Sequence, residues 1–250
     1  MLSGGDFKMN DTQELHNLHK GQRCVILGNG PSLNKVDFDL LQNEITFGVN
    51  SIFLKTNEIG FRTTYYVVED NLVFKENLQS IDDYSGVTKI LPKEYAAQLH
   101  NKDNLYSFEM NQNFYNKRNK ETFGIPVFNT SDKPIFYCGQ TVTYINLQLA
   151  FYMGFTEVIM VGMDFSYVKP KGHEQKGNHI HSNADDENHF HADYFGKGKT
   201  WKDPRLGRVM RCYHHAKFMY ESYGRKIINA TNGGKLELFP REKLKTIIGR

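Results

Sequence analysis

The stretch Cys24-Val25-Ile26-Leu27-Gly28-Asn29-Gly30-Pro31-Ser32-Leu33 decides the fold of this chain of 250 residues. Its first four residues form an apolar run that stops at a turn with two glycines, and a buried strand that breaks into a Gly-rich turn is the simplest explanation. Apolar residues then recur at positions 33, 36, 40 and 41, a spacing that predicts a helix from Leu33 to Leu41. The stretch therefore predicts a strand, a turn and a helix.

Further apolar runs of strand length follow, and most of them stop at polar residues. The runs are 45–49, 65–68, 89–92, 157–161 and 226–230. Polar residues directly after such runs are typical of parallel strands whose carboxyl ends face a ligand crevice. Helices are predicted from Thr141 to Met153, with an apolar stripe on one face, and from Arg205 to Tyr223. The order of elements predicts an α/β fold with a mostly parallel central sheet.

Composition limits the classes of protein to which the chain can belong. Hydrophobic residues make up 39% and charged residues 24%, proportions typical of a globular protein. The formal net charge is only +3 and no dense Lys/Arg run occurs, which argues against nucleic acid as a partner. Cys24, Cys138 and Cys212 lie far apart, so a disulfide framework or a cysteine zinc site is not expected and a reducing cytosol fits best.

The remaining expectations concern targeting and domain organisation. Residues 1–20 lack the apolar segment of a secretory signal, and no apolar run approaches the ~20 residues that cross a bilayer. We therefore expect a cytoplasmic protein, and if it works at a membrane, it does so at the inner surface. Residues 1–22 are expected to form a polar lead-in, and residues 23–250 a single nucleotide-binding α/β domain. Residues 169–203 are poor in apolar side chains, and a loop of this length is usually functional or mobile.

The Gly-rich turn is the first candidate ligand site. Gly28 and Gly30 let the backbone approach a phosphate closely, and the start of the next helix offers free amides and a positive dipole end. Ser32 could cap that helix or bind a phosphate oxygen. The pattern matches neither GxGxxG nor a Walker loop, so an ordinary strand–turn–helix corner is the alternative explanation.

Two further groups of polar residues follow predicted strands or begin a predicted helix. Asn50-Ser51 and Glu69-Asp70-Asn71 offer donors and acceptors to a base or a ribose, and turn formation is the alternative explanation. Gly139, Thr141 and Thr143 either form a second anion site or simply make a turn and a helix cap.

Five histidines lie within residues 169–203. They are His173, His179, His181, His189 and His191. The last four form two H-x-H pairs, which on a strand would place both rings of a pair on one side. A general base, a divalent-metal site and a solvated polar loop are the three explanations, in that order.

Two residues beyond the run 157–161 complete the candidate set. Asp164 follows the end of this predicted strand. Tyr167, with Lys169 and Lys171 beyond it, could stabilise a phosphate leaving group without a metal ion.

Taken as a set, six motifs resemble the 6-hydroxymethylpterin diphosphokinase MptE-like family. The motifs are Gly28-Asn29-Gly30-Pro31-Ser32-Leu33, Phe47-Gly48-Val49-Asn50, Thr141-Val142-Thr143-Tyr144, Gly162-Met163-Asp164-Phe165, Asn188-His189-Phe190-His191-Ala192-Asp193-Tyr194-Phe195 and Asn229-Ala230-Thr231-Asn232-Gly233-Gly234-Lys235-Leu236-Glu237. The resemblance implies a modified Rossmann-like sandwich. Many bacterial members of that family look like surface-polysaccharide proteins.

A subset of these motifs resembles the bacterial sialyltransferases that use CMP-sialic acid. That resemblance implies cytidine and phosphate contacts at Asn29, Gly30, Ser32 and Asn50, and a base at His189 or His191. Two departures matter: those enzymes have a Thr-Ser-Gly turn where this chain has Thr141-Val142-Thr143, and their phosphate-binding tyrosine pair is matched at best by Tyr167 alone. The resemblance therefore supports the nucleotide-binding crevice more strongly than it supports a specificity for sialic acid.

We therefore predict a glycosyltransferase-like enzyme that moves a sialic-acid-like or related sugar from a CMP-sugar or other nucleotide donor to a surface-glycan acceptor. The predicted catalytic residues are His191, His189 and Tyr167. The predicted nucleotide-binding residues are Gly28, Asn29, Gly30, Ser32, Asn50, Asp70, Gly139, Thr141, Thr143 and Asp164. The acceptor is expected to be a glycan or a lipid-linked glycan. Peripheral membrane contact and a homo-oligomer stay open.

The predicted sugar transfer requires no metal or other cofactor. Two alternative functions remain. One is an ATP-dependent diphosphokinase, which would need Mg²⁺ held by carboxylates such as Asp70 and Asp164. The other is a nucleotide-binding accessory protein without catalysis.

Overall fold

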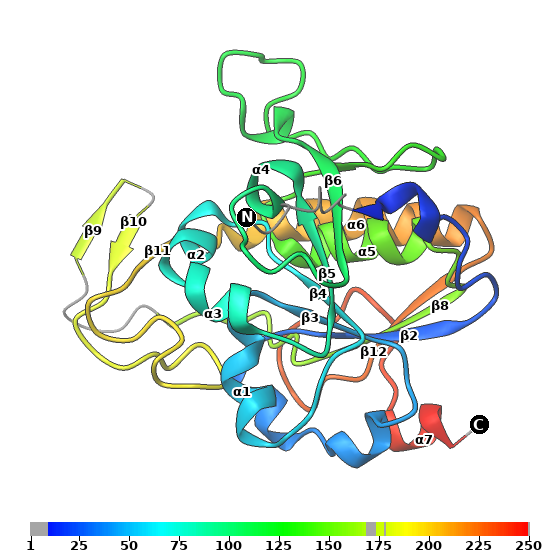
Figure 1. The fold of residues 1–250 in the computed structure, drawn as a ribbon, viewed down its shortest axis with the longest axis horizontal. Helices are drawn as coiled ribbons and strands as arrows, with labels where there is room; N and C mark the ends of the chain where they lie inside the picture. The colour runs from blue at the N-terminus through cyan, green and yellow to red at the C-terminus, as the bar shows by residue number, and fades with distance from the viewer. Residues whose placement is uncertain (1–9, 169–173, 178, 250) are drawn as a thin grey trace, which may run out of the picture.

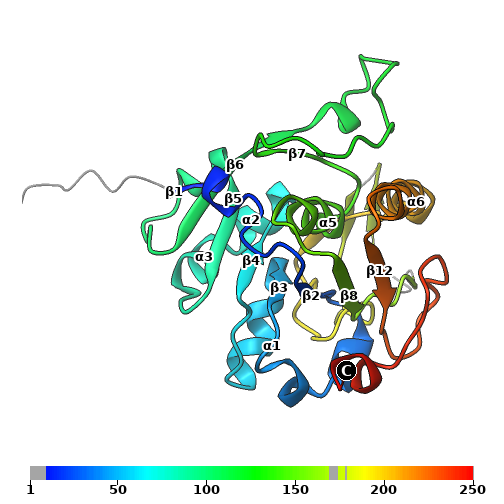
Figure 2. The same cartoon turned by 90° about the vertical axis from the view of Figure 1, so that its right-hand side faces the viewer.

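The computed structural model describes residues 10–168, 174–177 and 179–249, which form a nine-stranded sheet with helices on both faces (Figures 1 and 2). Every strand pair in this sheet is parallel, in the order β1-β6-β5-β4-β3-β2-β8-β12, and β7 pairs with β6. The strands are β1 (Asn10–Asp11), β2 (Arg23–Leu27), β3 (Thr46–Val49), β4 (Tyr65–Val67), β5 (Thr88–Pro92), β6 (Leu105–Asn111), β7 (Ile135–Tyr137), β8 (Glu157–Val161) and β12 (Lys226–Asn229). The predicted α/β fold with a mostly parallel sheet is confirmed.

The strands are apolar throughout because both faces of the sheet are covered. In β2, Cys24 and Ile26 belong to the hydrophobic core on one face, whereas Val25 and Leu27 belong to the core on the other. All four side chains are fully buried. Alternate residues of a strand point to opposite faces, so a strand buried on both sides needs an unbroken apolar run.

Seven α-helices lie in the described part of the chain, and five short 3₁₀ helices lie between the strands. The α-helices are α1 (Phe53–Glu58), α2 (Asn71–Glu76), α3 (Leu78–Asp83), α4 (Lys93–Ala96), α5 (Val142–Tyr152), α6 (Leu206–Ser222) and α7 (Leu244–Ile248). The 3₁₀ helices are η1 (Thr12–Leu15), η2 (Pro31–Lys35), η3 (Phe38–Leu41), η4 (Asn50–Ile52) and η5 (Asn113–Tyr115). Helices α5 and α6 lie on one side of the sheet, and α1 and α7 lie on the other (Figure 2).

Helix α5 differs from the amphipathic helix that the sequence predicted. All of its residues are buried, because α6 lies beside it on the same side of the sheet (Figure 2), and β7 and Phe128 also pack against it. The expected single apolar stripe was therefore wrong, because the helix is packed on all sides by the sheet, by α6 and by the segment between β6 and α5.

The predicted helix from Leu33 to Leu41 is also wrong in detail. The segment forms η2 and η3, and the backbone of Val36 between them is extended, with φ −79° and ψ 129°. The Asp37 side chain accepts a hydrogen bond from the amide of Asp39 and starts η3 anew. Local side-chain capping has outweighed the helical spacing of the apolar residues.

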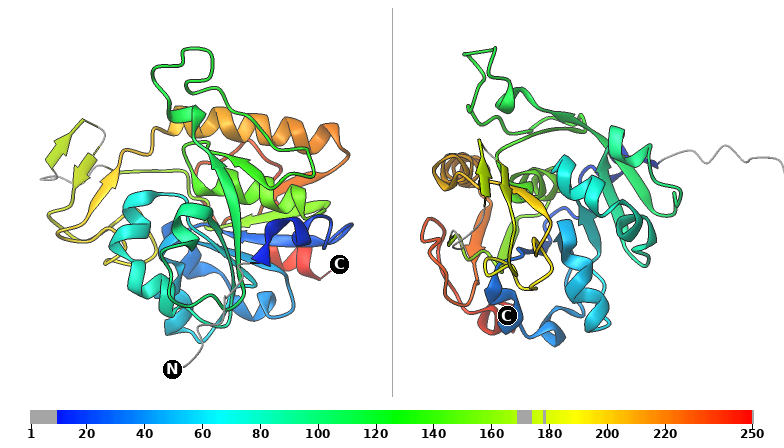
Figure 3. Two further views of the ribbon diagram at one scale, coloured as in Figure 1. Left: turned by 45° about the horizontal axis from the view of Figure 1, so that its top comes forward. Right: turned by 90° about the vertical axis from the view of Figure 1, so that its left-hand side faces the viewer.

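Residues 169–203 carry three short strands rather than a structureless loop. They are β9 (Glu174–Lys176), β10 (His179–His181) and β11 (Thr200–Lys202), and they pair antiparallel at one end of the molecule (Figures 1 and 3). Lys169, Lys171 and His173 lie outside the described residues. No helix in the part of the chain described here combines the length and the apolar character needed to cross a membrane.

Candidate functional site

The strand order reverses between β2 and β8. Strands β3 to β6 continue the sheet on one side of this pair, and β12 closes it on the other. Open parallel sheets bind ligands outside the carboxyl ends of their strands at such a switch point. Here β2 runs into Gly28-Asn29-Gly30, and β8 runs into Gly162-Met163-Asp164.

The two turns at the switch point pack directly against each other. The amide of Gly28 donates to Val161 O over 2.8 Å, and the amide of Gly30 donates to Gly162 O over 2.9 Å. A Cβ atom on Gly30 would lie 1.9 Å from Oδ2 of Asp164. A side chain at this position is therefore excluded by the neighbouring turn, which explains the glycine without any ligand.

Asp164 binds the residue that was expected to bind a phosphate. The Asp164 carboxylate accepts a hydrogen bond from the Ser32 hydroxyl over 2.6 Å and another from the Ser32 amide over 3.2 Å. The donors of Ser32, like the amides of Gly28 and Gly30, are therefore already engaged within the protein. The anion at this corner is a carboxylate of the chain itself, so a ligand phosphate would have to bind elsewhere in the crevice.

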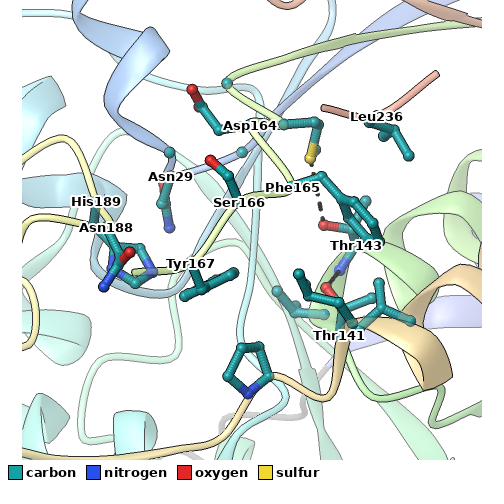
Figure 4. Close-up of a pocket in the computed structure, with 18 of the residues that line it drawn as sticks. Asn29, Thr141, Thr143, Asp164, Phe165, Ser166, Tyr167, Asn188, His189 and Leu236 are labelled. Atoms are coloured by element: carbon teal, nitrogen blue, oxygen red, sulfur yellow. Dashed lines mark hydrogen bonds between the residues drawn. The ribbon is translucent and has the colours of Figure 1, made fainter. Parts of the chain in front are cut away.

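The crevice has two adjoining compartments, which we call inner and outer. The inner compartment has a volume of about 140 Å³ and the outer one about 630 Å³. The predicted residues that line the inner compartment are Gly28, Asn29, Gly30, Asn50, Thr141, Thr143, Asp164, Tyr167 and His189 (Figure 4). Those that line the outer compartment are Asn50, Asp70, Thr141, Tyr167 and His189. Ser32, Gly139 and His191 line neither.

Three amide oxygens around the inner compartment have no hydrogen-bond donor among the residues that the structure describes. The Asn29 Nδ2 group donates to Val49 O over 2.9 Å and to the Tyr194 hydroxyl over 2.7 Å, which leaves its Oδ1 without a partner. Oδ1 of Asn50 and Oε1 of Gln140 are likewise buried and find no partner in the described part of the chain. A buried acceptor without a donor costs about 1–3 kcal/mol. Three of them around one cavity indicate a ligand that brings hydrogen-bond donors.

The backbone around the crevice is strained. Asn50, Gln140, Phe165 and Arg205 adopt positive φ angles of 49°, 65°, 52° and 46°, and all four line the inner or the outer compartment. Such a conformation costs of order 1–3 kcal/mol for a residue other than glycine, and it clusters at functional sites. The strain therefore marks the same crevice as the unpaired acceptors.

His189 is held as a potential base. Its Nδ1 lies 2.7 Å from Oδ2 of Asp186, and its ring stacks on Tyr194 at 4.0 Å between centroids. The carboxylate favours a proton on Nδ1, so the lone pair resides on Nε2. Nε2 makes no hydrogen bond to any residue that the structure describes. Because the His189 ring lines both compartments, it can receive a proton from a substrate there.

Asp186 was not among the predicted site residues. Burial raises the pKa of its carboxyl, but hydrogen bonds and charge from His189, together with the amides of Asn188 and Phe195, outweigh burial and bring the pKa below its usual value. Asp186 therefore stays ionised and orients the imidazole. The D-x-x-H spacing of Asp186 and His189 is the signal that could have found it.

The other histidines are placed differently. The His191 side chain is 35% exposed, and its Nδ1 accepts the amide of Asp193. His179 and His181 lie exposed on β10. Among the described residues, no group of three or more His, Cys, Asp or Glu side chains is arranged to hold a metal ion.

Tyr167 lies in the middle of the pocket, between His189 on one side and Thr141 and Thr143 on the other (Figure 4). Its ring meets the His189 ring edge-on at 5.8 Å between centroids. Its hydroxyl forms no hydrogen bond with the described part of the chain, so it can donate to a ligand.

The start of α5 is capped by its own threonine. Oγ1 of Thr141 accepts the amide of Thr143 over 3.3 Å, and the Thr143 hydroxyl points to Sδ of Met163 at 3.8 Å (Figure 4). A Cβ on Gly139 would lie 2.2 Å from the Tyr144 ring. The structure thus has the turn and the helix cap at this point, although Thr141 and Thr143 still line the crevice.

Two acidic residues lie at the end of β4 in the outer compartment. Asp70 caps α2 by accepting the amide of Leu72, and its other oxygen lies 2.9 Å from Nζ of Lys202. Glu69 is buried and accepts the Tyr115 hydroxyl over 3.1 Å. Burial, with the charge of Asp70, raises the pKa of Glu69.

The two carboxylates that could hold Mg²⁺ line different compartments. Asp164 lines the inner compartment and is bound to Ser32, whereas Asp70 lines the outer one and is bound to Lys202 and to the start of α2. Mg²⁺ needs carboxylate oxygens free to point at one octahedral centre. In this structure each of the two carboxylates is held by a protein partner of its own.

The sequence model of the 6-hydroxymethylpterin diphosphokinase MptE-like family matches residues 6–170. The chain belongs to this family. No curated protein matches it. The resemblance that the sequence motifs indicated is therefore confirmed at the level of the family.

Two solved structures are similar to this MptE-like chain. One is the MAf glycosyltransferase from Magnetospirillum magneticum AMB-1, with 11% identity and a TM-score of 0.55 over 94% of this chain. The chain spans only 38% of the length of that protein. The other is the sialyltransferase CstII from Campylobacter jejuni in complex with cytidine-5′-monophosphate, with 16% identity and a TM-score of 0.37; it covers 89% of this chain and 85% of its own. The first likeness shows a shared fold.

Proposed function

We propose that this MptE-like chain is a glycosyltransferase that takes a sugar from a nucleotide donor, a CMP-sugar by preference, and transfers it to a hydroxyl group of a glycan. The His189–Asp186 pair carries the proposal, because its imidazole lines both compartments and keeps Nε2 without a partner among the described residues. An oriented histidine with a free nitrogen is what proton removal from an acceptor hydroxyl requires.

The inner compartment is the place for the nucleoside. The unpaired oxygens of Asn29, Asn50 and Gln140 would accept hydrogen bonds from an exocyclic amino group or from ribose hydroxyls. Pockets for small molecules usually have about 300–1,000 Å³, and the inner compartment alone is smaller, at about 140 Å³. The sugar of the donor would therefore extend past His189 and Tyr167 into the outer compartment.

The proposed reaction combines three coupled events. Nε2 of His189 takes the proton of the acceptor hydroxyl as its oxygen attacks the anomeric carbon of the sugar. The bond from that carbon to the phosphate oxygen breaks, and the nucleotide leaves with the bonding electrons. The Tyr167 hydroxyl, which has no partner in the described chain, donates to the phosphate as its charge grows.

The family name favours a second candidate, the ATP-dependent diphosphokinase. Its chemistry needs Mg²⁺, and in this structure Asp70 and Asp164 are each held by a protein partner. Binding measurements separate the candidates. If CMP raises the melting temperature in EDTA, the transferase is supported; if only ATP with Mg²⁺ does so, the diphosphokinase is supported.

Turnover of CMP-sialic acid with a mixed glycan acceptor tests the base. His189→Ala should lower kcat/KM by about 10²–10⁴-fold, whereas His191→Ala, a partly exposed control outside the crevice, should change it by less than about threefold. Equal losses in the two variants would overturn the assignment. Tight CMP binding without turnover of any CMP-sugar would instead indicate an accessory protein.

A further inference from the structure

The outer compartment is rich in basic side chains. Five basic residues line it, against three acidic ones. The basic residues are Lys75, Lys117, Lys202, Arg205 and Arg208, and the acidic ones are Glu69, Asp70 and Asp203. The formal charge of the chain as a whole is only +3, so this excess is local to the crevice.

The acidic residues are largely used within the protein. Asp70 pairs with Lys202 and caps α2. Glu69 is buried against Tyr115, and burial raises its pKa, which favours its neutral form. Asp203 accepts the backbone amide of Arg205 over 3.2 Å. Among the described lining residues, Asp203 then remains as the ionised acid that faces the charges of Lys75, Lys117 and Arg208.

Arg208 is held by two aromatic rings and a backbone carbonyl. Its guanidinium carbon lies 4.7 Å from the ring centres of both Phe114 and Phe123, and Nη2 donates to Phe114 O over 3.3 Å. The backbone at Gly124 is so close that a Cβ there would lie 3.0 Å from Nη2. The segment between β6 and β7 therefore holds the guanidinium in place before any ligand arrives.

Arg208 forms no ion pair with the described residues. Burial, together with the charges of Arg205 and Arg211, lowers its pKa. The Arg208 side chain is only partly buried, so it remains accessible to an anion in the compartment. Its planar array of N–H groups matches phosphate oxygens.

We propose that the outer compartment binds a phosphate group of the acceptor, with Arg208 as the fixed contact and Lys117 and Lys75 as supporting charges. The inference rests on the proposed function only in naming the acceptor as the source of the phosphate. The acceptor would thus be a phosphorylated glycan, either a free sugar phosphate or a lipid-linked diphosphate, whose hydroxyl then lies next to His189.

Calorimetric titration with inorganic pyrophosphate in EDTA tests the site, with and without saturating CMP. We expect pyrophosphate to bind the CMP-loaded protein, and Arg208→Gln to weaken this binding at least tenfold. Arg211→Gln is the matched control, because Arg211 lies on the same helix, is exposed, and does not line the compartment. It should weaken binding less than threefold.

Three results would overturn the proposal: no binding of pyrophosphate, equal effects of the two variants, or competition between pyrophosphate and CMP, which would assign the phosphate site to the donor. If Arg208→Gln fails to fold, Lys117→Gln replaces it, since Lys117 is exposed. If the protein binds pyrophosphate but does not bind CMP, the anion site is supported and the CMP donor is not. The two proposals can therefore fail separately.

A second titration identifies the source of the phosphate in the CMP-loaded protein. A hexose 1-phosphate and a detergent-solubilised polyprenyl diphosphate sugar are compared with the unphosphorylated hexose. Binding of either phosphate at least tenfold tighter than the neutral sugar supports the site and shows which source it prefers. Equal binding of all three overturns it.

Discussion

The carboxylate of Asp164 accepts hydrogen bonds from both the amide and the hydroxyl of Ser32, the latter over 2.6 Å. It thereby ties the end of β8 to the start of η2, across the point where the strand order reverses. The Gly28–Ser32 turn, which the sequence predicted to bind a phosphate, is stabilised by this carboxylate of the protein itself.

The first prediction tests this contact by a double-mutant cycle of Ser32→Ala and Asp164→Asn. Each change should lower the free energy of unfolding by about 1–3 kcal/mol, because a buried hydrogen bond to a charged group is lost. The coupling measured by urea unfolding should exceed about 0.5 kcal/mol. Strictly additive losses would show that the two residues do not stabilise each other.

The second prediction concerns Gly30→Ala. The new Cβ would meet Oδ2 of Asp164 at 1.9 Å and the Gly162 carbonyl oxygen at 2.8 Å, so the free energy of unfolding should fall by about 1–3 kcal/mol or more. Gly207→Ala in α6 is the control, since its Cβ meets nothing within 4 Å. It should be neutral or stabilising by up to about 1 kcal/mol. A Gly30→Ala protein as stable as the control would contradict the packing of the two turns.

The third prediction concerns Asp186→Asn and acid. The folded state lowers the pKa of Asp186, so the stability it contributes is present above its unfolded pKa, near 3.9, and is lost as pH falls through the folded value. The advantage of the native protein over Asp186→Asn should be largest at neutral pH and should shrink below about pH 4. Melting temperatures of both proteins from pH 3 to 7 check this; a constant difference would contradict it.

The fourth prediction has the opposite sign and concerns Glu69→Gln. Burial raises the pKa of Glu69, so its stabilising effect is complete below the unfolded pKa, near 4.3, and disappears as pH rises through the folded value. Glutamine keeps an oxygen for the Tyr115 hydroxyl without the charge. The stability of the variant relative to the native protein should therefore improve from pH 4 towards pH 8, as measured by urea unfolding. A relative stability that worsens over this range would mean that the ionised form is preferred.

The fifth prediction concerns Tyr167→Phe. Its hydroxyl has no partner in the described chain, so the melting temperature should change little, while turnover of a CMP-sugar should fall by about 10–10²-fold through loss of a donor to the leaving phosphate. Tyr223→Phe, an exposed tyrosine 55% accessible at the end of α6, is the control. Unchanged turnover in Tyr167→Phe would remove the residue from the mechanism.

Much of the sheet was predictable because its strands are buried on both faces. Runs such as Cys24–Leu27 and Glu157–Val161 match β2 and β8 closely. The strand β6 was missed, since its sequence Leu-Tyr-Ser-Phe-Glu-Met-Asn mixes polar and apolar residues and has one side chain exposed. Periodicity reports burial, and an element of mixed burial gives a weak period.

For the site, the sequence predicted which strand ends lie at the crevice better than it predicted the contacts of their side chains. Residues at strand ends, such as Asn29, Asn50 and Asp164, do line the crevice, because the ends of parallel strands meet at one edge. Their contacts could not be predicted, and Arg208 was not predicted at all. Its place depends on the stacking of Phe114 and Phe123 from a segment about 90 residues away in the sequence.

By itself, the sequence determined that this is an α/β protein of the MptE-like family with polar residues at the ends of its parallel strands. These features can be recognised locally, because strands buried on both faces are continuous apolar runs and sharp turns contain glycine. Only the tertiary structure decided that Asp164 occupies the Ser32 corner, that Asp186 orients His189 rather than His191, and that cations gather in the outer compartment. Those relationships are distances between side chains from separate segments, and packing sets such distances only after the chain has folded.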